Sequence, residues 1–88
     1  MTVNKTLEER GNNYGKFRTQ AALSQQLKNT MRNTAKWEEL EPFQQEALEM
    51  IQHKAARLLN GNPAHSDGWH DISGYATLVE RILNGEDI

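Results

Sequence analysis

The feature that most constrains the fold is a long apolar stripe in the middle of the chain. Over residues 42–59, apolar residues recur at intervals of three and four, the spacing of one helix face. Pro42 suits the first turn of a helix, and Asn60-Gly61 suits its end. The sequence therefore predicts a helix with an apolar face, and this face must pack against other elements. The stripe consists of Phe43, Ala47, Met50, Ile51, Ala55, Leu58 and Leu59.

Two other segments, residues 16–33 and 67–83, show the same helical periodicity. We expect the amide-rich side of the first helix, including Gln20, to face solvent, and Ser66 or Asp67 to cap the second. No strand pattern occurs, so the sequence predicts an all-α fold. It is a small antiparallel bundle of three to four helices, in one domain spanning residues 1–88. The two apolar stripes consist of Phe17, Ala21, Leu23, Leu27 and Met31, and of Trp69, Ile72, Ala76, Val79 and Ile82 or Leu83.

The remaining segments are short. Residues 2–10 contain a sequence typical of the start of a helix, and we expect this short helix to end at Gly11-Asn12-Asn13. Glycine and asparagine are common in turns between helices. Residues 33–40 break the periodic pattern, so we expect a connector with one turn of helix and Trp37 against the core.

Composition limits the classes of function. A net charge of -2 without a basic run argues against a general nucleic-acid surface. The absence of cysteine excludes disulfides and thiolate zinc sites, and no apolar run approaches the roughly 20 residues of a membrane span. The first ten residues lack the apolar core of a signal peptide, so we expect a cytoplasmic protein. Apolar residues make up only 36% of this short chain, and association into a homo-oligomer would add burial.

Groups that could bind a ligand gather between residues 54 and 75. Lys54 and Arg57 lie three residues apart on one helix face, where they could hold a phosphate. Arg57 could instead form a fork with Asp71, as a structural ion pair between helices. Histidines 65 and 70 have a poor spacing for zinc, and we expect His53 to be exposed.

Two acidic pairs could bind a cation. Glu46 and Glu49 lie three apart on the central helix, and Asp67 and Asp71 lie four apart on the next one. If these helices are antiparallel, Glu46, Glu49 and Asp71 could bind Mg2+ beside a phosphorylated ligand. The alternative is that these acids are ordinary solvated residues.

Three aromatic residues fall near the same groups. Trp69 and Tyr75 have the spacing of core residues, but either could stack on a base. Tyr14-Gly15 suits a turn or a close approach to a ligand.

Three segments, R-G-N-N-Y-G, K-A-A-R-L-L-N-G-N-P and D-G-W-H-D-I-S-G-Y-A, resemble a group of small helical domains encoded by phages and prophages. The resemblance runs from Arg10 to about Val79. These domains are more distantly similar to nucleotide-modification-associated domains and to MazG-like all-α nucleotide pyrophosphohydrolases. The MazG-like enzymes carry E-x-x-E on one helix and E-x-x-D on the next, whereas the second motif here is D-x-x-x-D. The resemblance implies family-defining roles for Tyr14, Gly15, Lys54, Arg57, Asp67, Trp69, Asp71, Gly74 and Tyr75.

Three functions follow as hypotheses. The first is a phage-type nucleotide pyrophosphohydrolase that uses Mg2+, and the second is a domain that binds a nucleotide or another small anion without cleaving it. The third is a non-enzymatic protein-protein interaction module in which residues 54–75 are structural.

Overall fold

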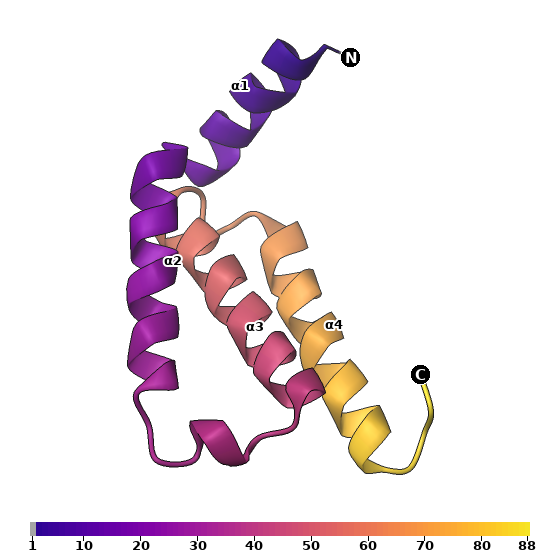
Figure 1. Ribbon diagram of the computed structural model, residues 1–88. Helices are drawn as coiled ribbons and strands as arrows, with labels where there is room; N and C mark the ends of the chain where they lie inside the picture. The colour runs from indigo at the N-terminus through magenta and orange to yellow at the C-terminus, as the bar shows by residue number, and fades with distance from the viewer. Residues whose placement is uncertain (1) are drawn as a thin grey trace.

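The computed structural model describes residues 2–88, and these form four α-helices and one short 3-10 helix (Figure 1). No strand occurs in these residues, so the all-α prediction is confirmed. None of the helices within the described range is long and apolar enough to cross a membrane. The helices are α1 (Val3–Tyr14), α2 (Phe17–Arg32), η1 (Trp37–Glu39), α3 (Pro42–Asn60) and α4 (Ser66–Leu83).

Helix α3 lies in the middle of the molecule and packs against α2 on one side and α4 on the other (Figure 1). Within residues 2–88, α2 and α4 are not packed against each other. The three helices therefore form a single antiparallel layer with two open faces. Helix α1 projects away from this layer, and its C-terminal end meets the loop between α3 and α4.

The ends of α3 agree with the sequence prediction to within one residue. Pro42 occupies the first turn, and the side chain of Gln44 accepts a hydrogen bond from the backbone N–H of Glu41 (2.9 Å). The connector before it contains the expected helical turn, η1, and Trp37 is buried. Local capping chemistry thus determines where the central helix begins.

The predicted end of the first helix at Gly11 is wrong, since α1 continues to Tyr14. The carbonyl of Asn13 accepts a hydrogen bond from the backbone N–H of Asn62 (2.7 Å). The carbonyl of Tyr14 accepts one from Nδ2 of Asn60 (2.8 Å). The hydrogen bonds from Asn60 and Asn62 satisfy carbonyls that the end of a helix otherwise leaves unpaired. They also keep Gly11 and Asn12, which are weak helix formers, in the helix.

The predicted apolar stripes are also partly wrong, because Leu59, Ala76 and Leu83 are exposed. Phe17 is 76% exposed and Trp69 is 57% exposed, whereas Gln20, expected in solvent, is only 4% exposed. Helix α4 approaches α3 at Gly68, where a Cβ atom would lie 2.9 Å from Cδ2 of Leu58. The helices can approach this closely because glycine has no side chain. The first turn of α4 therefore packs against α3 through Gly68 and not, as predicted, through Trp69.

The N-cap of α4 also differs from the prediction. His65, and neither Ser66 nor Asp67, occupies the cap position, and it makes no side-chain capping bond. In residues 2–88 the buried apolar residues are few: Trp37, Ala47, Ala56 and Leu58.

Candidate functional site

Four basic side chains gather where α2 and α3 run side by side. Lys28 comes from α2, and His53, Lys54 and Arg57 come from consecutive turns of α3. Burial lowers the pKa of His53, and the positive charges of Arg57, Lys28 and Lys54 lower it further. The ion pair between Arg32 and Glu49 sets the register of α2 against α3, and this register brings Lys28 level with His53. We call Lys28, His53, Lys54 and Arg57 the cationic cluster.

Lys54 pairs with a carboxylate from the neighbouring helix. Its Nζ lies 3.0 Å from Oδ2 of Asp71, and the lysine side chain is only 15% exposed. The hydrogen bond and charge of Lys54 lower the pKa of Asp71, with a smaller contribution from Arg57. Asp71 therefore pairs with Lys54 and not with Arg57, the partner that the sequence analysis considered.

Arg57 instead contacts an aromatic residue from outside the helix layer. Its guanidinium carbon lies 4.8 Å from the centroid of the Tyr14 ring, within the range of a cation-π contact. The Tyr14 ring meets His65 edge to face, with centroids 5.7 Å apart. The Nε of Arg57 is buried without a hydrogen-bond partner, and no ion pair within residues 2–88 involves Arg57 or Lys28. Two cations of the cluster, Lys28 and Arg57, therefore have no ion-pair partner in the described chain.

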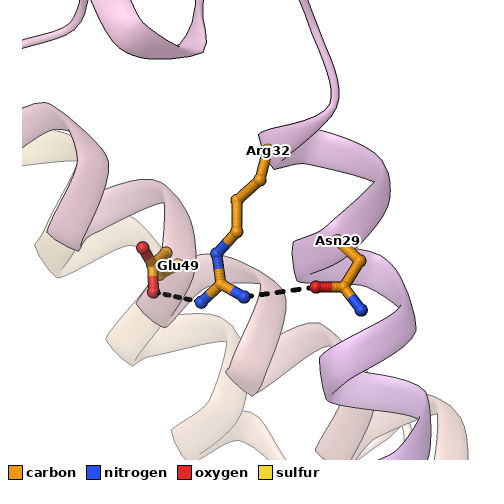
Figure 2. Close-up of polar contacts among 3 residues, drawn as sticks. All are labelled: Asn29, Arg32 and Glu49. Carbon is orange, nitrogen blue, oxygen red and sulfur yellow. Dashed lines mark hydrogen bonds and ion pairs between the residues drawn. The ribbon is translucent and has the colours of Figure 1, made fainter.

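The contact between α2 and α3 is unusually polar. Arg32 of α2 pairs with Glu49 of α3 at 2.8 Å and also donates to Oδ1 of Asn29 at 3.3 Å (Figure 2). Along antiparallel helices, a step of about one turn from this pair brings Lys28 level with His53.

One helical turn beyond Lys28 and His53, Ser24 of α2 lies level with Arg57 of α3, and Gln20 lies one turn further along α2. Gln20 Nε2 and Ser24 Oγ, like the arginine Nε, are buried without a partner. Buried polar atoms normally have partners, so three in one region mark a place that suits a polar ligand or ordered water.

The segments that carry the family resemblance meet at one junction. Nδ2 of Asn60 donates to the carbonyls of Tyr14 (2.8 Å) and Lys16 (3.1 Å), so it joins α3 to the turn between α1 and α2. Gly15 in that turn has a φ of 76° and packs against Asn60. Nε1 of Trp69 donates to the carbonyl of Pro63 at 2.7 Å. These contacts position Tyr14 over Arg57 and fix the start of α4.

The acidic residues predicted as magnesium ligands are only partly placed together. Glu49 is paired with Arg32, Asp71 is paired with Lys54, and Glu46 is exposed. Within residues 2–88 no group of three or more histidine, aspartate and glutamate side chains could hold a metal ion. Binding of Mg2+ by Glu46, Glu49 and Asp71 therefore stays a prediction.

The other predicted ligand residues lie around the start and middle of α4. Asp67 is exposed and lies 3.5 Å from Nε2 of His65. Tyr75 is half-buried and borders, with Asp71, an open hollow of about 680 Å³. All residues that line this hollow belong to α4, so no second element encloses it.

Two residues of the cationic cluster were missed by the sequence reading. His53 was expected to be exposed but is half-buried, and Lys28 was not singled out. The available signal was the polar series Gln20, Ser24, Lys28 and Arg32, which repeats every four residues and so marks one side of α2.

No curated protein and no solved structure shows a significant match to the chain. A family model matches residues 2–83, a range that includes the cationic cluster, the junction at Tyr14 and the Lys54–Asp71 pair. The chain therefore belongs to the family of the domain of unknown function DUF6378.

Proposed function

We propose that this domain binds a small phosphorylated anion at the cationic cluster, and that the ligand is a nucleotide. The observation that carries the proposal is the unbalanced charge of Lys28 and Arg57, which form no ion pair within the described chain. A phosphate group can accept charge-assisted hydrogen bonds from several cations at once. It would also provide the acceptor that the buried Nε of Arg57 lacks.

The setting of Arg57 favours such a role. A guanidinium group presents five N–H donors in a fixed plane, and here the Tyr14 ring contacts the group at 4.8 Å. A side chain already held in place loses less conformational freedom when a ligand binds. Arg57 is thus a preorganised donor, and Lys28 and Lys54 would supplement it.

Protonation of His53 should be linked to binding. In the free protein, burial and the neighbouring cations oppose its charged form. A bound phosphate would offset the repulsion and raise the pKa of His53, so the complex would take up a proton. We therefore expect affinity to increase as the pH falls through about 6.5, the ordinary pKa of histidine, towards the lower pKa of His53 in the free protein.

The nucleotide class rests on the resemblance to phage helical domains and, more distantly, to MazG-like enzymes. It supports a role in phage nucleotide metabolism. Tyr75 lies about one turn from Asp71 on α4 and is the residue we propose for stacking on a base. Trp69 is two residues from Asp71 and so projects from nearly the opposite side of α4.

Isothermal titration calorimetry with nucleoside di- and triphosphates, in EDTA, would test the proposal. We expect the wild-type protein to bind at least one of them, and Arg57→Gln to weaken binding about 10- to 100-fold, as for lost hydrogen bonds between charged groups. Arg18→Gln is the matched control, because it removes the same charge from an exposed position of α2. Absence of binding to every nucleotide, or equal weakening by both substitutions, would refute the proposal.

The same titration repeated with Mg2+ tests the metal and hydrolysis predictions. A gain in affinity that Asp71→Asn and Glu46→Gln remove would support magnesium binding. If the wild-type protein released more pyrophosphate from a nucleoside triphosphate than the Asp71→Asn variant, the domain would also be a hydrolase.

The second candidate is a non-enzymatic interaction module. The observation that favours it is that several family-defining residues make contacts that hold the fold together. Tyr14 accepts a hydrogen bond from Asn60, Lys54 pairs with Asp71, and Trp69 donates to the α3–α4 loop. Here Arg57→Gln would lower the melting temperature without changing affinity for any nucleotide. The calorimetric titration therefore separates the two candidates.

A further inference from the structure

We propose that the apolar face of the helix layer is covered by a second copy of this chain. This inference is independent of nucleotide binding. The face is centred on a groove of about 290 Å³ between α3 and α4, whose lining is apolar except for Gln44 and includes Leu48, Ala76 and Val79. A helix layer normally buries such a face against another layer, and no element of the described chain lies over this one.

The apolar surface continues along both helices beyond the groove. Leu59 is about three turns from Leu48 and so lies on the same side of α3. Trp69 and Leu83 lie about two turns before and after Ala76 on α4, and therefore on the same side of that helix. Leu59, Trp69 and Leu83 are 71%, 57% and 64% exposed. We define the apolar face as Leu48, Leu59, Trp69, Ala76 and Leu83.

The total exposed area is large enough to supply a stable interface. The chain exposes 6391 Å², whereas a compact monomer of 10.1 kDa exposes about 5,300 Å². Its radius of gyration is 14.8 Å, against about 12 Å for a compact domain of this length. The projecting α1 and the one-layer arrangement both contribute to these differences. The excess of about 1,100 Å² compares with the ~800 Å² per partner that a standard protein interface buries.

A second copy is the occupant that best fits these properties. The five residues of the apolar face carry no charge, so two such faces meet without repulsion and each can bury the other in a two-fold arrangement. The cationic cluster of one copy would instead repel that of another. The chain's net charge of only -2 gives little long-range repulsion between copies.

Sedimentation equilibrium of the full chain would test the proposal. At about 100 μM, well above the micromolar Kd of weak interfaces of this size, we expect twice the mass of one chain. Leu48→Glu would place a charge in the apolar face and should restore the mass of a monomer. Circular dichroism would show whether the variant is folded, and Leu59→Glu, at a more exposed position, replaces it if Leu48→Glu does not fold.

Leu78→Glu is the matched control. Leu78 is 45% exposed, close to the 36% of Leu48, but it borders the hollow on the other side of α4. We expect this variant to remain a dimer. A monomeric wild type, a dimeric Leu59→Glu variant, or dissociation by Leu78→Glu would overturn the proposal.

Discussion

Gly61→Ala should strongly destabilise this protein, because the position lies where two backbone segments touch. A Cβ atom at residue 61 would overlap the carbonyl oxygen of Asn13 and the Cα of Tyr14, and would lie 2.6 Å from the Tyr14 carbonyl carbon. These are backbone atoms, so no side-chain rotation can relieve the overlap. The α1–α2 junction would have to move away from the α3–α4 loop.

The cost can be estimated from the contacts that such a movement breaks. Forcing extra volume into a packed site costs roughly 1–3 kcal/mol. The movement would also break the hydrogen bonds that Asn13 and Tyr14 accept from Asn62 and Asn60, each worth about 1 kcal/mol. We expect a loss of about 3 kcal/mol, which lowers the melting temperature of a domain this size by about 12 °C or more.

Thermal unfolding followed by circular dichroism would measure this effect, with all variants at one protein concentration because self-association would shift the transition. The matched control is Gly74→Ala. A Cβ at residue 74 meets no atom within 4 Å, and Gly74 lies inside α4. Alanine there should stabilise the helix by about 0.5–1 kcal/mol. A Gly61→Ala variant that melts within about 2 °C of wild type would refute the described junction, because even a 1 kcal/mol loss shifts the transition further.

Four further outcomes follow from named contacts. Asn60→Ala removes two hydrogen bonds to the α1–α2 junction and should cost about 1–2 kcal/mol in urea denaturation. Trp69→Phe keeps a ring but loses the bond to the loop, and should cost about 1 kcal/mol in the same assay. Because Lys54 lowers the pKa of Asp71 below 3.8, the stability from this pair is present above about pH 4. It is lost as the pH falls through the folded-state pKa, and Asp71→Asn should remove this pH dependence. The lowered pKa of His53 means that the unfolded state binds its proton more readily, so stability should fall below about pH 6.5; NMR titration should give a pKa below 6.5, and His53→Gln should remove the effect.

The helices were predictable where local chemistry determines them. Pro42 and the Asn60-Gly61 pair bound α3, and the periodic residues of α4 ended within a residue of the prediction. The end of α1 was not predictable, because Gly11 and Asn12 are weak helix formers. They stay helical because Asn60, at the end of α3, and Asn62, in the α3–α4 loop, donate hydrogen bonds to the carbonyls of Tyr14 and Asn13 that follow them.

The packing sides of the helices were harder to predict than the helices themselves. A periodic stripe indicates an apolar side but not the distance at which a neighbour packs. Phe17 begins α2 beside the projecting α1 and stays exposed, while Gln20 and Ser24 lie buried. Likewise, Trp69 has the spacing of a core residue, but Gly68 allows α3 to approach so closely that the glycine occupies the contact.

The candidate site was predictable only for groups that share a helix. Lys54 and Arg57 lie three residues apart, so their common side of α3 followed from helical geometry. Their partners depend on the packing of three elements, and the sequence could not distinguish Lys54 from Arg57 as the partner of Asp71. Lys28 joins the cluster only because the register of α2 against α3 brings it level with His53.

The two proposals place their functions on opposite faces of one layer, and this makes them separable. Leu48 and Arg57 are about two and a half turns apart on α3, so they project in opposite directions. A charge at Leu48 should therefore dissociate the dimer and leave the affinity for nucleotide within about threefold of wild type, since exposed charges this far apart are largely screened. Arg57→Gln should instead weaken nucleotide binding and leave the dimer intact. If Leu48→Glu abolished both properties while circular dichroism showed a folded protein, the binding site would have to include residues from the second copy, and the site on one chain would be incomplete.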